Sequence, residues 1–145
     1  MTVFDFFKKK KLPPHLLVGI YGEKKATAFL KRKGYKITER NFSAHGKEID
    51  IIAENKDFFV FCEVKTRITN DFLIKKYGRP ADAVNYYKQR NIIDGAKIYL
   101  SSNPTKKQIR FDVIEVYLSQ NKNKLKIESI NHMENAFRSY FRVII

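Results

Sequence analysis

Two short stretches carry the residues best suited to chemistry. The first is Glu48-Ile49-Asp50 and the second is Glu63-Val64-Lys65, with the polar run Asn55-Lys56-Asp57 between them. Residues 48–54 and 58–66 are rich in β-branched and aromatic side chains, so we expect two strands joined in a hairpin. Carboxylates and a lysine gathered on such a hairpin could bind a cation and act on a phosphate.

The register of this hairpin decides which side chains meet. A turn that is symmetric around Asn55 and Lys56 pairs Glu48 with Glu63 and makes Asp50 a diagonal neighbour of Glu63, with Cα atoms roughly 7–8 Å apart. Because side chains alternate along a strand, one face then carries the acidic residues together with Lys65. The other face is expected to be core, formed by Ile49, Ile51, Val60, Cys62 and Val64.

Carboxylates this close repel one another unless a cation lies between them or one of them is protonated. A hard cation such as Mg²⁺ binds oxygen ligands and keeps several waters, which suits a site shared with a phosphate. Lys65 could stabilise the charge of a reacting phosphate or orient the attacking water. An ion pair of Lys65 with Glu48 or Glu63 on a solvated strand is the simpler alternative, and geometry alone leaves both interpretations open.

The remaining sequence predicts the elements that position this hairpin. We expect helices at 15–33, closed by Gly34, and from Pro80 to about residue 100. Strands are expected from Tyr35 to Arg40, at 109–118 and at 124–130, with a short helix in the tail from Asn131. The order α-β-β-β-α-β-β predicts an α/β sandwich in one domain, residues 13–145, after a basic N-terminal arm, residues 1–12.

Three further groups have two interpretations each. Glu23 shares a helical stripe with Ala26 and Leu30, so it is either turned toward the core or an exposed helix charge. Tyr86, Tyr87 and Tyr99 could stack on unpaired bases, but core packing is favoured at helical spacing. A basic loop with Lys75, Lys76 and Arg79 either contacts DNA or is solvated. Separately, we expect a surface ion pair between Arg110 and Asp112.

The charge balance points to a polyanionic partner. The chain has 29 Lys and Arg against 15 Asp and Glu, a net charge of +14. Such a surface attracts nucleic acid, DNA above all, or an anionic membrane. We expect no transmembrane segment, since no stretch reaches the roughly 20 apolar residues of a span, and no secretory signal. The single cysteine excludes an internal disulfide and a thiolate zinc site, which favours a cytoplasmic protein.

The range from Gly22 to Val116 resembles a known family. The matching pieces are GEKKATAFLKRKGYKITERNF, EIDIIA, VFCEVKTR, a lysine-bearing helix and RFDVIEV. They resemble the YraN-type family of small bacterial proteins, which is similar to Holliday-junction resolvases of the PD-(D/E)XK nuclease superfamily. The resemblance implies a restriction-endonuclease-like three-layer α/β sandwich with a central mixed sheet. It also implies a metal-dependent endonuclease that hydrolyses DNA phosphodiesters, branched DNA included, with Mg²⁺ or Mn²⁺.

The resemblance assigns roles to individual residues. Asp50 and Glu63 would be metal ligands together with the backbone carbonyl of Val64, and Lys65 would be the catalytic lysine. Glu23 would be the helix glutamate that completes the acidic cluster. Glu48 would be a second acid, although Gly46-Lys47-Glu48 interrupts the usual glycine-glutamate contact. Lys88, on the second helix, would face phosphate.

Other functions stay open beside the nuclease. One alternative is a DNA-binding module that keeps the nuclease fold without appreciable catalysis. Another is a membrane-surface or protein-interaction module that uses the Phe and Lys residues of the range 4–11. Because resolvases cut two strands symmetrically, the resemblance also allows a homodimer.

Overall fold

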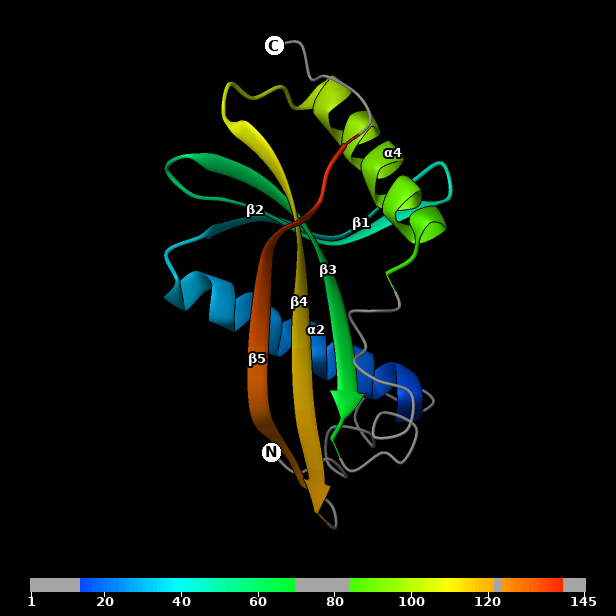
Figure 1. Ribbon diagram of the computed structural model, residues 1–145, viewed down its shortest axis with the longest axis vertical. Helices are drawn as coiled ribbons and strands as arrows, with labels where there is room; N and C mark the ends of the chain where they lie inside the picture. Colours follow the sequence, from blue (N-terminus) through cyan, green and yellow to red (C-terminus); the bar gives the residue numbers. More distant parts are fainter. Residues whose placement is uncertain (1–13, 70–83, 122–123, 140–145) are drawn as a thin grey trace.

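The computed structural model describes residues 14–69, 84–121 and 124–139. Figure 1 traces two helices and a sheet through them. The order α-β-β-β-α-β-β is the one that the sequence predicts. The elements are α2 (Pro14–Arg32), β1 (Lys36–Ala44), β2 (Lys47–Glu54), β3 (Phe58–Ile68), α4 (Tyr86–Ser102), β4 (Gln108–Asn121) and β5 (Lys124–Phe137).

The five strands form one mixed sheet in the order β1-β2-β3-β4-β5. Neighbouring strands are antiparallel except β3 and β4, which are parallel. Parallel neighbours need a crossover connection, and α4 lies within it. The protein is therefore an α/β protein with a mixed sheet, as expected.

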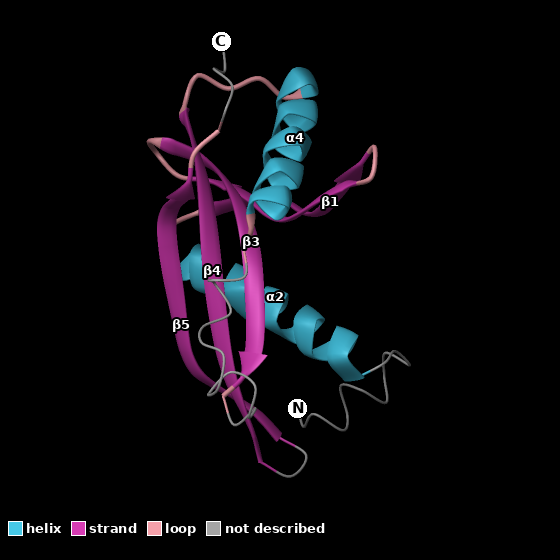
Figure 2. Cartoon of the chain, turned by 45° about the vertical axis from the view of Figure 1, so that its right-hand side comes forward, coloured by secondary structure: helices cyan, strands magenta, loops and turns pink. Residues whose placement is uncertain are grey.

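The two helices cover opposite faces of the sheet, as Figure 2 shows. On the α2 face, Ala26 and Leu30 belong to one buried cluster with Val60 and Cys62. On the α4 face, a second cluster joins that helix to the aromatic rings of the sheet. Its members include Phe59, Phe61, Ile92, Ala96, Tyr99 and Phe111. Burial on both faces explains why β3 begins with an unbroken apolar run.

The end of α2 follows the sequence prediction closely. Gly34 has φ of 94°, the left-handed conformation expected of the residue that follows a helix. The N–H of Gly34 donates to the Lys31 carbonyl, and the N–H of Tyr35 donates to the Leu30 carbonyl. This paired arrangement stops the helix and leads directly into β1.

The predicted hairpin register is wrong by two residues. The strands pair Ile51 with Cys62 and Glu54 with Phe59, so the turn is centred one residue later than expected. The cause is Asn55, whose side-chain oxygen accepts hydrogen bonds from the N–H groups of Asp57 and Phe58. A shift by two residues keeps the side chains of the paired residues 51–54 and 59–62 on their faces, whereas a shift by one would have exchanged the faces.

Three other expectations fail in the second half of the chain. The predicted helix from Asn131 is wrong for residues 131–137, because β5 continues to Phe137, which pairs with Phe111. Arg110 and Asp112 form a buried ion pair, not a surface one. Tyr87, expected in the core stripe of the second helix, is 78% exposed.

Several sequence predictions lie outside the described residues. They are the basic arm of residues 1–12 and the loop residues Lys75, Lys76 and Arg79. In the part of the chain that the structure describes, no helix combines the length and apolar character needed to cross a bilayer.

Candidate functional site

The candidate site lies where β2 separates from β3. Backbone pairing between these strands is recorded from Glu54 and Phe59 as far as Ile51 and Cys62. Beyond that point β3 continues beside β4 to Ile68, and β2 continues beside β1 to Lys47. In Figure 1 the β1–β2 pair turns away from the long axis that β3 and β4 follow. The opening between the two strands, here called the fork, brings side chains from both faces of the sheet together.

Asp50 lies inside the fork. Its Oδ2 accepts a hydrogen bond of 2.8 Å from the N–H of Val64, which takes the place of a backbone partner. The expected alternation breaks here, because Ile49 packs on the α4 face while Ile51 packs on the α2 face. On β1 the facing residue, Asn41, has φ of 54°, so both strands are irregular at the same level. The predicted single core face of β2 is therefore wrong at Ile49.

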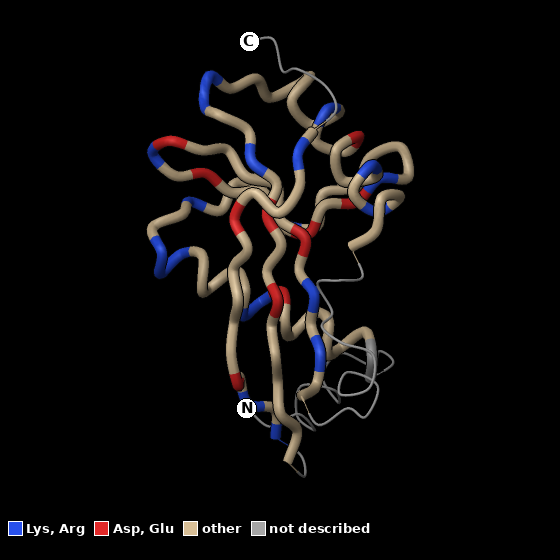
Figure 3. The backbone as a smooth tube through the Cα atoms, in the orientation of Figure 1, with Lys and Arg blue, Asp and Glu red and all other residues tan. Residues whose placement is uncertain are grey.

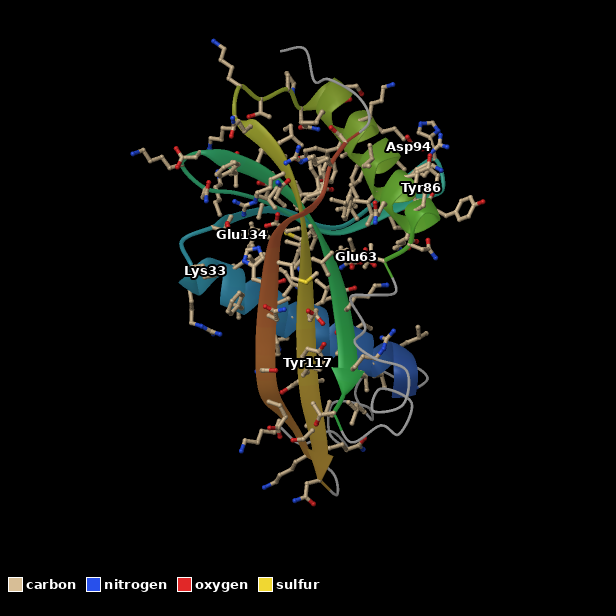
Figure 4. The ribbon with its side chains drawn as sticks, in the orientation of Figure 1. Lys33, Glu63, Tyr86, Asp94, Tyr117 and Glu134 are labelled. Carbon is tan, nitrogen blue, oxygen red and sulfur yellow. The ribbon has the colours of Figure 1, made fainter. Side chains whose placement is uncertain are left out.

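Glu63 reaches the fork from β3 and is only 5% exposed. Burial raises the pKa of Glu63 to about 7, and repulsion from Asp50 acts in the same direction, against the attraction of Lys88 and Lys65. The Oε1 of Glu63 faces both lysines, whereas its buried Oε2 has no hydrogen-bond partner in the part of the chain that the structure describes. A buried carboxylate oxygen without a partner is costly and marks a position where a ligand would be accommodated. Figure 4 shows Glu63 near the centre of the molecule, below the beginning of α4.

Glu23 comes to the same place from α2, on the other face. Burial raises the pKa of Glu23 to about 7, Asp50 raises it further, and Arg40 opposes the shift. Gly22 makes this approach possible, since a methyl group at its Cα would come within 1.8 Å of the Thr66 hydroxyl oxygen. The helix therefore contacts β3 through a residue without a side chain, and the next residue carries the carboxylate into the fork. The inward interpretation of Glu23 holds.

Glu48 lies at the rim of the site. It lines a pocket of about 170 Å³ together with Glu23 and Asp50, and its charge contributes to raising the pKa of Glu23. Unlike the other acids it is exposed. Glu48 therefore adds negative charge to the pocket from its solvent side.

Two lysines balance part of this negative charge. Lys65, two residues after Glu63 on β3, has its Nζ 3.5 Å from Glu63 Oε1. Lys88, in the first turn of α4, has its Nζ 3.6 Å from the same oxygen. In Figure 3 several acidic positions gather near the centre of the molecule, where the strands cross, and most basic positions lie nearer its outline. The fork is thus an acidic centre with lysines on its α4 side.

The carboxylates fit a divalent cation in charge and chemistry. Among the described residues Glu63 Oε2 has no hydrogen-bond partner. Burial raises the pKa of Glu63 and of Glu23, and repulsion from Asp50 raises both further, so a cation beside these carboxylates would favour their ionised forms. Over the described ranges, no group of three Asp, Glu, His or Cys residues could hold a metal ion by itself. A cation in the fork would therefore also use oxygens from the backbone, water or a phosphate, as Mg²⁺ commonly does.

Sequence reasoning missed two residues of this region. Arg40 on β1 interacts electrostatically with Glu23, and nothing local in the sequence indicates that contact. Glu115 on β4 pairs in register with Lys65 and is 1% exposed, with hydrogen bonds from the Tyr117 hydroxyl and the Asn131 amide. An isolated glutamate within the apolar run of β4 was the one available signal for a buried polar group.

Comparison with known proteins identifies the chain's relatives. The family described as "Uncharacterised protein family UPF0102" matches residues 22–116, a range that includes Glu23, Asp50, Glu63 and Lys65. The UPF0102 protein of Caldanaerobacter subterraneus subsp. tengcongensis is 48% identical over 121 residues, which cover 83% of this chain and 93% of the relative. A UPF0102 protein of Clostridium acetobutylicum is 44% identical over 121 residues, with the same two coverages of 83% and 93%. A relative in Chlorobium phaeobacteroides is 41% identical over 128 residues, 87% of this chain and 96% of the relative. The chain belongs to the protein family UPF0102.

Proposed function

We propose that the protein is a metal-dependent endonuclease that hydrolyses DNA phosphodiesters, with a restriction-endonuclease-like arrangement of its sheet and helices. The observation that carries this proposal is the buried Glu63 Oε2, which has no hydrogen-bond partner among the described residues, on a side chain that interacts with Asp50 and Lys65. The net charge of +14 supports a polyanionic substrate. The resemblance to PD-(D/E)XK nucleases agrees with both features.

Asp50 and Glu63 would hold Mg²⁺ or Mn²⁺, with the Val64 carbonyl as a further ligand. Glu23 and Glu48 line a pocket together with Asp50. When bound, such an ion polarises a phosphate and lowers the pKa of a coordinated water. The hydrogen bond from Val64 N–H orients the Asp50 carboxylate toward the fork. Glu23 lines a pocket with Asp50 and could accept a proton from an attacking water there.

Lys65 is the cation best placed to act on the reacting phosphate. It is mostly buried, whereas the Lys88 side chain is 37% exposed. In this proposal the Lys65 ammonium leaves Glu63 for the scissile phosphate and stabilises the charge that develops there. Lys88 holds the neighbouring phosphate.

The test is cleavage of linear, single-stranded and four-way DNA by the purified protein with Mg²⁺ or Mn²⁺. We expect cleavage that stops with a chelator and with Asp50→Asn or Glu63→Gln. Lys65→Met should lower the rate by about 10²- to 10³-fold without weakening the metal affinity measured by calorimetry, because it removes a cation that competes for Glu63. No cleavage of any substrate with either metal would refute the catalytic proposal.

A second candidate is a DNA-binding module with the same fold and no turnover. It is favoured by the two lysines on Glu63 Oε1, because these ion pairs neutralise the carboxylate without a metal. DNA binding that depends on salt but is indifferent to chelator and to Glu63→Gln would support this candidate. Membrane binding, the remaining alternative, would be shown by sedimentation with anionic vesicles and no affinity for DNA.

A further inference from the structure

Two adjacent aromatic side chains at the beginning of α4 are left in solvent. Tyr86 is 63% exposed and Tyr87 is 78% exposed, and their ring centroids lie 5.9 Å apart. In the described part of the chain, Leu16 is the other large hydrophobic residue with such exposure. Figure 4 shows Tyr86 on the outer side of α4. Leaving two rings uncovered gives up apolar burial that folding could have used, so the pair is available to a partner with a flat apolar face.

The surroundings of the pair are positively charged. The Arg90 guanidinium lies 5.6 Å from the centroid of the Tyr86 ring, and its Nη1 donates to the Tyr86 hydroxyl at 3.4 Å. Lys88 follows Tyr87 directly, and the first turn of α4 holds no acidic residue. Aromatic faces beside cations match a nucleobase with its phosphate, whereas an apolar protein surface would leave the cations uncompensated.

The pair is also connected to the fork. Lys88 contacts Glu63 with an Nζ–Oε1 distance of 3.6 Å, and it belongs to the same helical turn as the tyrosines. One turn of helix advances about 5.4 Å. Because successive helix residues are turned by about 100°, the Tyr87 side chain points about a quarter turn away from Lys88 and Tyr86 nearly opposite to it. A nucleic-acid strand with one phosphate at Lys88 would therefore pass around the beginning of α4 and reach Tyr87 first.

We propose that Tyr86 and Tyr87 stack on unpaired nucleobases, so that the substrate is nucleic acid with a single-stranded segment next to the reacting phosphate. The inference rests on the proposed function, because it names the substrate class of the same site. In an intact duplex the base faces are covered by their neighbours and a surface ring has no access to them. A flap, gap, branch or free strand presents those faces.

Fluorescence tests the contact directly. The chain contains no tryptophan, so Tyr87→Trp places a single reporter at the position. Titration with oligo(dT) of about 12 nucleotides in chelator should quench it to saturation, and a blunt duplex at equal nucleotide concentration should not. Leu16→Trp, also exposed but on α2, is the matched control and should respond to neither. Quenching of Tyr87→Trp by neither DNA, or equally by both, would overturn the inference.

Binding measurements separate stacking from charge. Tyr87→Ala and Tyr86→Ala should each weaken the affinity for the single strand by roughly 5- to 150-fold, the range for loss of one stacked base, and Tyr87→Phe should keep it. An unchanged affinity of both alanine variants would refute the stacking contact. Because the side chains are exposed, the alanine variants should unfold at the wild-type temperature, which circular dichroism checks.

Two outcomes distinguish this inference from the nuclease proposal. If the single strand quenches Tyr87→Trp but the protein cleaves no DNA, the stacking contact is supported and the nuclease proposal is refuted. If the protein cleaves duplex DNA but no DNA quenches Tyr87→Trp, the nuclease proposal is supported and the stacking contact is refuted.

Discussion

Asp50 Oδ2 accepts a hydrogen bond of 2.8 Å from the backbone N–H of Val64, at the level where the β2–β3 pairing ends. One carboxylate thus satisfies a backbone group that the fork would otherwise leave without a partner. The same carboxylate raises the pKa of both Glu63 and Glu23. Asp50 therefore links the stability of the fork to the charge of the candidate site.

Asp50→Asn and Asp50→Ala should differ in stability. The Asn side-chain oxygen can still accept from Val64 N–H while the negative charge is lost, so the metal-free protein should keep or exceed its free energy of unfolding. The Ala variant leaves the N–H without a partner and should lose roughly 1–3 kcal/mol. Urea unfolding in chelator measures both, and equal losses in the two variants would contradict the role of this hydrogen bond.

Glu63→Gln should stabilise the metal-free protein at alkaline pH. The pKa of Glu63 is raised from 4.5 to about 7, so the folded protein favours the protonated carboxyl group. The contribution of this group to the free energy of unfolding is fully present below pH 4.5 and is lost as the pH rises through about 7. The Gln side chain cannot ionise. The difference in the free energy of unfolding between Glu63→Gln and wild type should therefore grow in favour of the variant by roughly 1–3 kcal/mol between about pH 4 and pH 8. The exposed Glu128→Gln is the control for the substitution itself. If urea unfolding shows the same difference in the free energy of unfolding between wild type and Glu63→Gln at every pH, the prediction is contradicted.

Gly22→Ala should displace α2 from β3. The added methyl group would meet both Oγ1 and Cγ2 of Thr66, so we expect a loss of roughly 1–3 kcal/mol and a weaker response to Mn²⁺. Gly19→Ala, on the same helix, is the matched control because no atom of the described residues lies within 4 Å of its added methyl group. Gly19→Ala should be neutral or stabilising by up to about 1 kcal/mol. Thermal unfolding with and without Mn²⁺ compares them, and equal behaviour would refute the close approach at Gly22.

Asp112→Asn should be strongly destabilising. Asp112 is fully buried and accepts hydrogen bonds from Arg110, His132 and the N–H of Asn135. Without its charge the buried Arg110 guanidinium loses its main partner, so we expect a loss of roughly 3–5 kcal/mol in urea unfolding. The exposed Asp57→Asn is the control.

The pH dependence of that loss has a definite sign. Burial alone would raise the pKa of Asp112, but the hydrogen bonds from His132 and Arg110 lower it below its ordinary value. The contribution of Asp112 to the free energy of unfolding is therefore present at a pH above the ordinary carboxyl pKa. It disappears as the pH falls through the lowered pKa of Asp112. The difference between wild type and Asp112→Asn should narrow in acid, and a difference that widens there would contradict this account.

Much of the fold could be predicted because its signals are local. The order of helices and strands follows from apolar periodicity, and the end of α2 follows from Gly34 alone. The placement of Glu63 and Lys65 on one side of β3 follows from strand alternation, and the contact between them agrees with it. Each of these depends on residues a few positions apart, whose relative placement the backbone geometry limits.

What only the tertiary structure decided depends on how separate elements pack. Glu23 enters the fork because α2 contacts Thr66 through Gly22, and Lys88 reaches Glu63 from a helix on the other face. The burial of Asp112 and the exposure of Tyr87 likewise depend on which face meets a neighbouring element. Sequence spacing limits the distance between nearby residues on one element, but distances between elements are determined by the packing of the whole core, to which every buried side chain contributes.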